Sequence, residues 1–236
     1  MSDTRARSAM ISRLSRILSC LCLVLCSSGT AWGLDAPQTA ERLQNRYAEL
    51  KSFAADFEQT LTHRESGAVE RRSGKLRFQK PLLIRWETDK PHQELLVVGE
   101  KEIWDYLPDE ELAYRYPLSM VKDSRGIIQV ITGQAALTRD FDVRDEGPEG
   151  PYVRLRLYPK EPEPHMVEAV IRVDAKSGYI QQTEITDFYG NKNEVRFTSF
   201  SPGARFSPGD FRFSPPRGVD VEDHTGKKTH ERQLFN

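Results

Sequence analysis

Cysteine is nearly absent from this chain. Cys20, Cys22 and Cys26 all lie in one short apolar stretch near the N-terminus, and no cysteine follows. The long remainder of the chain therefore cannot form a disulfide, a thiolate metal site or a cysteine nucleophile. A lipidated cysteine usually follows a small residue, whereas Leu21 and Leu25 precede Cys22 and Cys26. Cys20 does follow Ser19, but cleavage there would leave almost no apolar core, so a lipoprotein signal is disfavoured.

Long hydrophobic runs are also missing. A helix needs about 20 apolar residues to span a bilayer, and the apolar run over residues 17–26 is about half that length. It follows a segment with four arginines and precedes small residues that end in Ala31-Trp32-Gly33. This order predicts a cleaved secretory signal peptide over residues 1–33 and a single domain over residues 34–236.

Neither sign of charge is in large excess. Residues 34–236 keep 30 of the 34 Lys and Arg residues and 34 of the 35 Asp and Glu residues, which gives a net charge of about −4. Nucleic-acid-binding domains usually present a basic face instead. We therefore predict no nucleic-acid partner.

Motifs that carry chemistry are absent too. The histidines are scattered, and none stands near an acidic residue at a spacing typical of metal ligands: His63, His92, His165, His224 and His230. The sequence has no nucleophile elbow, no phosphate-binding glycine loop and no HExxH motif. We predict no catalytic residue, no metal site, no cofactor and no enzymatic activity.

What the sequence does contain is a series of short alternating runs. Residues 39–50 have helical spacing of apolar residues after Thr39, which can cap a helix. Strands with period-2 alternation follow at residues 53–62, 69–78, 83–87, 95–98, 103–107, 112–116, 152–158, 167–173, 179–187 and 194–200. Turns rich in Gly and Pro separate them, which favours an antiparallel sheet that closes or nearly closes into a barrel.

One segment interrupts the series of strands. Residues 124–137 contain four β-branched apolar residues within five positions, and Ser124 can cap a helix there. We predict a short apolar helix that lies across the mouth or the concave face of the sheet.

The alternation also assigns side chains to faces of the sheet. Over residues 75–87 the even positions Leu76, Phe78, Ile84 and Trp86 are apolar, whereas the odd positions are polar or charged. Trp104 and Tyr106 share a face in the following hairpin and are expected on the same apolar side. Such a face is either a packed core or a ligand site. A sheet of about ten strands is too wide for its own side chains to fill, so a helix, a ligand or a void must occupy its middle.

Several short motifs, in order, resemble one known family. They are Phe53-x-x-Asp56-Phe57-x-Gln59, then Gly74-x-Leu76-x-Phe78-x-Lys80-Pro81 with Trp86, then Pro91 with Leu95-Leu96-Val97, Ile103-Trp104-x-Tyr106, and Phe211-x-Phe213-x-Pro215-Pro216-x-Gly218-Val219-x-Val221. In this order and spacing, behind a signal peptide, the chain resembles the LolA-type periplasmic carriers of outer-membrane lipoproteins.

The resemblance implies an α+β fold, an incomplete (unclosed) antiparallel β-barrel of about ten or eleven strands with helices forming a lid over a hydrophobic cavity. The lipid-binding residues it implies are Phe53, Phe57, Leu76, Phe78, Ile84, Trp86, Leu96, Trp104, Tyr106, Ile127, Ile128 and Ile131. In the family, a basic residue before the conserved proline bonds the lid backbone and holds the empty form shut. Here that position is Lys80.

The partners that the resemblance implies are acylated lipoproteins, an inner-membrane ABC transporter that loads them and an acceptor at the outer membrane. The protein is expected to be periplasmic and monomeric. A carrier or sensor of another lipid, a phospholipid or a glycolipid, would present the same apolar face, and the sequence leaves this alternative open.

Overall fold

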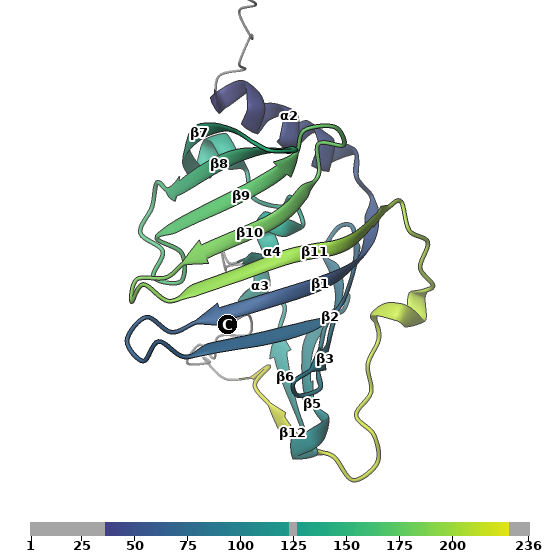
Figure 1. Cartoon of the computed structure of the whole chain (residues 1–236). Helices are drawn as coiled ribbons and strands as arrows, with labels where there is room; N and C mark the ends of the chain where they lie inside the picture. The colour runs from purple at the N-terminus through teal and green to yellow at the C-terminus, as the bar shows by residue number, and fades with distance from the viewer. Residues whose placement is uncertain (1–35, 123–126, 227–236) are drawn as a thin grey trace, which may run out of the picture. The chain divides into compact units, whose positions relative to one another are not determined.

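A computed structural model describes residues 36–122 and 127–226 of the chain (Figure 1). These residues contain one twelve-stranded sheet. Its strands are β1 (Ser52–Thr62), β2 (Val69–Gln79), β3 (Leu83–Lys90), β4 (Glu94–Val98), β5 (Glu102–Leu107), β6 (Leu112–Pro117), β7 (Phe141–Glu149), β8 (Tyr152–Pro159), β9 (Glu168–Asp174), β10 (Ile180–Thr186), β11 (Lys192–Pro202) and β12 (Asp220–Asp223). The helices are α2 (Ala36–Glu49), α3 (Ser119–Lys122), α4 (Ile127–Ile131) and α5 (Leu137–Asp140), with 3₁₀ turns η1 (Pro108–Glu110) and η2 (Pro208–Phe211).

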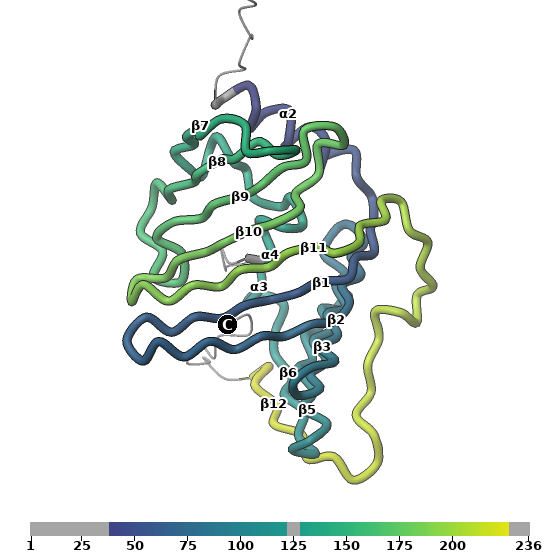
Figure 2. The backbone as a smooth tube through the Cα atoms, viewed as in Figure 1, coloured from purple at the N-terminus to yellow at the C-terminus, as the bar shows by residue number. Residues whose placement is uncertain are grey.

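The strands form an open, strongly curved sheet in the order β12-β6-β5-β4-β3-β2-β1-β11-β10-β9-β8-β7 (Figure 2). Neighbouring strands are antiparallel, except that β12 lies parallel to β6. Because β7 and β12 are not paired with each other, the sheet stays unclosed. The predicted incomplete antiparallel barrel is thereby confirmed.

The structure has more strands than the ten or eleven predicted. Gly147 and Pro148 are residues typical of turns, but both belong to β7, a strand that was not predicted. Since β7 is the last strand of the sheet, one of its edges has no partner strand, and an edge strand tolerates a proline. The other addition is β12, a strand of four exposed residues.

The helices also differ in extent from the predicted ones. α2 begins at Ala36, three residues before the predicted start at Thr39. The apolar segment over residues 124–137 forms the five-residue α4, followed by α5, rather than one helix. Ser124, its predicted cap, lies outside the described residues, as do the signal-peptide region 1–33 and the tail after residue 226.

One face of the sheet, here called the inner face, carries most of the core. Residues directly opposite each other on neighbouring strands point to the same side, and the register aligns Phe53, Phe78, Ile84, Val98 and Ile103 in one row across β1–β5. All five side chains are fully buried. The helices that cover this face are α2 and the lid segment, residues 118–140, which holds α3, α4 and α5.

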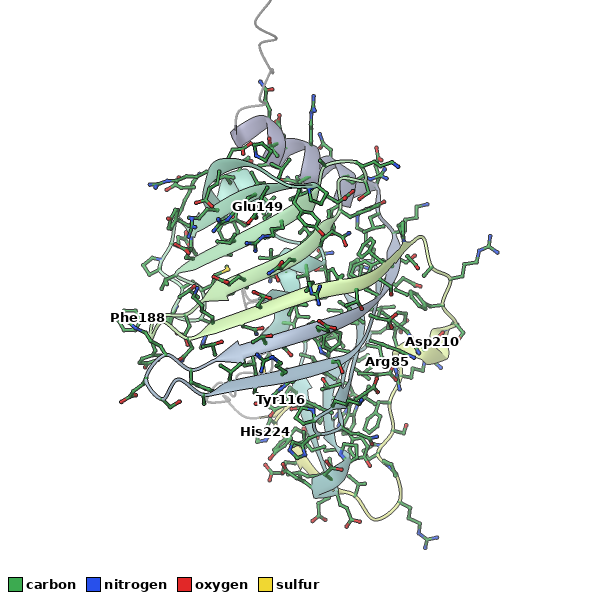
Figure 3. All side chains as sticks on the ribbon, in the orientation of Figure 1. Arg85, Tyr116, Glu149, Phe188, Asp210 and His224 are labelled. Atoms are coloured by element: carbon green, nitrogen blue, oxygen red, sulfur yellow. The ribbon has the colours of Figure 1, made fainter. Side chains whose placement is uncertain are left out.

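The opposite, outer face is covered by a different part of the chain. After β11 the C-terminal strap, residues 203–223, crosses the outer side of β3–β5 and returns as β12 beside β6 (Figure 1). Elsewhere the outer face carries ion pairs between strands, such as the pair of Arg172 on β9 with Glu149 on β7, which reaches across β8 at 2.7 Å (Figure 3 labels Glu149). Each face of the sheet therefore has its own cover.

Candidate functional site

The inner face is apolar over most of its area because the strands alternate. Beside the row that contains Phe53 lies a second row, in which the register aligns Ala55, Leu76, Trp86 and Leu96. The ring centroids of Trp86 and Phe57 lie 4.6 Å apart. Of the predicted lipid-binding residues, the structure brings together on this face Phe53, Phe57, Leu76, Phe78, Ile84, Trp86 and Leu96.

Aromatic rings concentrate at the end of the inner face near α2. Phe53 lies 5.3 Å from Phe78 and 4.8 Å from Phe200, measured between ring centroids. Phe200 also lies 4.9 Å from Tyr179. Contacts between rings at these distances add to the free energy of burial, so this end of the face forms a continuous aromatic surface.

The lid segment contributes aliphatic side chains to the same core. Val121, Ile128 and Ile131 are each at most 2% exposed. Ile128 and Ile131 therefore pack into the same core as the inner face. Ile127 begins α4, but its side chain lies outside the described ones.

The lid segment is also hydrogen-bonded to the sheet. Gln134 donates from Nε2 to the carbonyl oxygen of Pro81 at 2.9 Å, at the turn between β2 and β3. Close by, Gly133 ends the helical turn of α4 with a φ of +68°. A Cβ at this position would stand 2.4 Å from Cβ of Tyr47, so a glycine is required where α4 meets α2.

Tyr47 links α2, the lid segment and the sheet. Its hydroxyl oxygen accepts a hydrogen bond from the backbone N–H of Ile180 on β10. Burial raises the pKa of this hydroxyl well above its ordinary value, because the anionic form would lose its hydration. Tyr47 therefore stays neutral and keeps α2 against the sheet.

Lys80 also connects the sheet to α2. Its Nζ donates to the backbone carbonyl oxygens of Tyr47 and Ala48, each at 2.7 Å. These carbonyls belong to the last turn of α2, where carbonyl oxygens accept no hydrogen bond within the helix and where the helix dipole favours a cation. The predicted latch residue thus bonds α2, and its neighbour Pro81 is the residue that the lid segment contacts.

The expected inward position of Trp104 and Tyr106 is wrong. In β5 the buried alternate positions are Ile103 and Asp105, and Ile103 pairs with Val98 of the inner face. Trp104 and Tyr106 do share a face, but it is the outer one, where both rings contact Phe213 of the strap at 5.7 and 5.1 Å. The error arose because the largest apolar side chains were assigned inward, although this strand buries an aspartate there.

The far half of the inner face was missed. Leu155, Ile171, Val195 and Phe197 on β8, β9 and β11 are buried in the same core as Phe53. Alternation at residues 153–157 and 169–173 is visible in the sequence and could have identified two of them. Their strands were predicted, but no motif drew attention to their apolar positions.

A few polar residues also lie on the inner face. Gln59 and Thr183 are buried there, and Gln59 Nε2 donates to Oδ1 of Asn193 at 3.0 Å. Among the described residues the Thr183 hydroxyl has no hydrogen-bond partner. A buried polar group without a partner costs about 1–3 kcal/mol, so this position is unusual for a packed core.

Among the described residues no group of three or more His, Cys, Asp or Glu side chains is placed to hold a metal ion. None of the helices described is long and apolar enough to cross a membrane. What the site offers is apolar surface under a cover made of short helices, which suits binding of an apolar ligand.

Comparisons with known proteins agree with this geometry. Residues 48–214 match the family described as outer membrane lipoprotein carrier protein LolA. An outer-membrane lipoprotein carrier protein of Chromobacterium violaceum is 29% identical over 84% of this chain and 95% of its own length. One of Proteus mirabilis is also 29% identical, over 89% of this chain and 99% of its own.

A solved structure of an uncharacterised conserved protein from Thermus thermophilus has the same fold. It superposes with a TM-score of 0.52 and 16% sequence identity, over 80% of this chain and 98% of that one.

Proposed function

This chain belongs to the LolA family of outer-membrane lipoprotein carrier proteins, and we propose that it shields the acyl chains of lipoproteins while they cross the periplasm. The observation that carries the proposal is the inner face itself. Phe53, Trp86 and their neighbours form an apolar surface, and the lid segment that covers it does so with aliphatic side chains that an acyl chain can replace.

Transport of such cargo needs a protein of this kind. Each methylene of an acyl chain exposed to water costs about 0.8 kcal/mol, so a lipoprotein with several chains does not leave a membrane unaided. Contact with an apolar inner face offsets that cost. Since hydrophobic contact has no fixed direction, the same face accepts lid side chains in one state and acyl chains in the other.

Exchange between the lid and the lipid gives loading and release. In this proposal the described structure, with Ile128 and Ile131 in the buried core, corresponds to the closed state. A ligand shifts the balance between closed and open states only by its difference in affinity for them. In this proposal Lys80 favours the closed state through its bonds to α2, and loading requires those bonds or the lid contacts to yield.

The proposed pathway has a donor and an acceptor. An inner-membrane ABC transporter loads the carrier with an acylated lipoprotein, and an acceptor at the outer membrane receives it. The predicted signal peptide over residues 1–33 would place the protein between the two membranes. No chemical step is required of the carrier, and a single inner face serves one cargo molecule per monomer.

Native mass spectrometry of the protein purified from the periplasm tests this proposal. We expect acylated lipoproteins to co-purify at near one-to-one ratio. Phospholipid or glycolipid in their place would show a carrier of another cargo on the same fold. A reproducibly empty protein would contradict the carrier function.

A further inference from the structure

Three polar residues of the inner face lie in one line. The register places Gln59 of β1 opposite Arg72 of β2 on one side and opposite Val195 of β11 on the other, and Val195 stands opposite Thr183 of β10. Opposite residues share a face, so Arg72, Gln59 and Thr183 form a single row across four strands. We call this set the polar row.

The polar row lies toward the end of the sheet away from α2. Gln59 stands near the end of β1 and Arg72 near the start of β2, beside the β1–β2 turn at the left of Figure 1. The β10–β11 turn is at the same end, since Arg64 N–H donates to Oδ1 of Asn191 at 3.1 Å. The aromatic cluster around Phe53 is at the opposite end, next to α2 and Lys80.

The inner face therefore changes along its length from aromatic to polar. The register pair two positions from Gln59 and Arg72 is Phe57 with Gly74, and the Phe57 ring contacts Trp86. Apolar surface thus directly adjoins hydrogen-bonding groups. An amphiphile has the same sequence of chemistry, from hydrocarbon chain to carbonyl groups to polar head.

Each member of the polar row can donate a hydrogen bond to a ligand. The Thr183 hydroxyl is fully buried and has no partner among the described residues. α4 contacts β10, so a lid that leaves the face uncovers this hydroxyl. Arg72 uses Nε toward Glu70 at 2.7 Å and Nη1 toward Glu94 at 3.3 Å, and its Nη2 takes part in neither contact.

The charges around Arg72 define the class of ligand. Glu70 and Glu94 both contact its guanidinium, so the three charged groups together carry a net charge of −1. A phosphate would meet two carboxylates there, whereas a neutral carbonyl oxygen can accept a hydrogen bond without that repulsion. The row therefore suits an uncharged acceptor.

We propose that the polar row, Arg72, Gln59 and Thr183, is a subsite for the uncharged ester or amide carbonyls that join acyl chains to the polar part of the cargo. The chains then extend along Trp86 and Phe57 toward Phe53. This inference rests on the proposed carrier function and adds to it the part of the lipid that is recognised and the direction in which it lies.

A matched pair of lipids tests the subsite. 1,2-Dioctanoylglycerol has two ester carbonyls, and the ether 1,2-dioctylglycerol has the same chains without them. The affinity of the purified protein for each lipid is measured by displacement of the bound fluorescent dye 1-anilinonaphthalene-8-sulfonate. We expect the ester to bind about tenfold more tightly than the ether, because one additional charge-assisted or buried hydrogen bond changes the affinity by about this factor.

Two variants locate the effect. Thr183→Val replaces the hydroxyl by a methyl group of similar size, and Arg72→Met removes the guanidinium. Each should bring the ester affinity down toward that of the ether and leave the ether affinity unchanged. Because the hydroxyl has no partner in the closed state, Thr183→Val should also melt at the same temperature as the parent protein or higher.

The outcomes separate the subsite from the carrier function. Equal affinity for ester and ether in the parent protein, or an ester preference that persists in both variants, overturns the polar row and leaves the carrier function standing. Tighter binding of the matching phosphatidic acid than of the diacylglycerol overturns the choice of an uncharged ligand. Failure of the parent protein to bind either lipid contradicts both proposals.

Discussion

The lid segment and the C-terminal strap each cover an apolar patch of the same sheet, but they are held in different ways. The lid segment buries Val121, Ile128 and Ile131 against the inner face. The strap places Phe213 against the outer face and is fixed by the β12 pairing with β6 and by ion pairs.

The difference decides which cover a lipid can displace. An acyl chain offers the lid's binding surface the same kind of apolar contact that the lid provides. It cannot replace the strap's backbone pairing, nor the ion pairs that join Arg77 to Asp210 at 3.5 Å and Arg115 to Asp223 at 3.0 Å. In the proposed function the more deeply buried cover is therefore the exchangeable one.

The largest effect on lipid binding should come from a charge placed on the inner face, compared with the same charge placed on the outer face. Trp86→Glu puts a carboxylate on the inner face, where an unpaired buried charge costs several kcal/mol, so we expect lipid affinity to fall by at least about 100-fold. Trp104→Glu is the control on the outer face, beside the Arg115 guanidinium, and should bind lipid as the parent protein does.

Circular dichroism establishes that both variants are folded, and dye displacement measures lipid binding. Equal loss of binding in the two folded variants would remove the distinction between the faces. Retained binding in Trp86→Glu would refute its place in the lipid site.

A second comparison uses two glycines with similar backbone geometry. Gly133 in the lid segment has a φ of +68° and Gly203 at the start of the strap +73°. An alanine at either site has backbone strain of about 1–2 kcal/mol, but only at Gly133 does the new Cβ also collide with Tyr47.

We expect Gly133→Ala to open the lid, which raises the fluorescence of an apolar dye several-fold, while Gly203→Ala lowers the melting temperature slightly without dye binding. Similar dye binding in both variants would mean that strain alone, and not the contact of α4 with α2, controls the lid.

A smaller effect is expected at Lys80. Lys80→Met removes two hydrogen bonds from a half-buried ammonium group to α2, which should favour the open state by about 1 kcal/mol after solvent screening. Lys80→Arg keeps the charge and should restore closure. Dye binding and lipid release rates distinguish the two. An identical open fraction in Lys80→Met and the parent would show that Lys80 is no latch.

The smallest expected effect concerns acid pH. Hydrogen bonds from Ser207 hold the pKa of Asp210 below its ordinary value of 3.8, and those from Thr225 do the same for Asp223. A carboxylate whose pKa is lowered by folding stabilises the fold above its unfolded pKa, and the contribution is lost as pH falls through the folded value. The strap should therefore loosen below pH 3.8.

Two tryptophans report the two faces separately after removal of the signal region, since Trp104 contacts the strap and Trp86 is buried in the core of the inner face. The Trp86→Phe variant keeps Trp104, whose emission should shift to longer wavelength as the pH falls below 3.8. The Trp104→Phe variant keeps Trp86, whose emission should change only at lower pH. Simultaneous shifts would indicate that one transition loosens both covers.

Much of this arrangement could be predicted from the sequence. Alternation identified Leu76, Phe78, Ile84 and Trp86 as one face, because period 2 leaves no other arrangement in a strand. It could not say which face of β5 is inner, because Trp104 lies under a segment more than a hundred residues later in the chain.

The polar groups were harder still. Thr183 and Gln59 look like ordinary strand residues, and only the register of four strands brings them into line with Arg72. Long-range pairing of this kind leaves no local signal in the sequence.

The place of the lid segment in the strand order has one more consequence. It connects β6 with β7, which are the first and last strands of the antiparallel series. In the proposed function, a lid segment that leaves the inner face therefore remains tied to β7, one edge of the sheet, and to β6, the strand beside the other edge strand β12. Any widening of the opening would then be limited by the reach of this tether. The length of residues 118–140 thus sets an upper limit on the girth of the cargo, a quantity that insertions or deletions in this segment would tune.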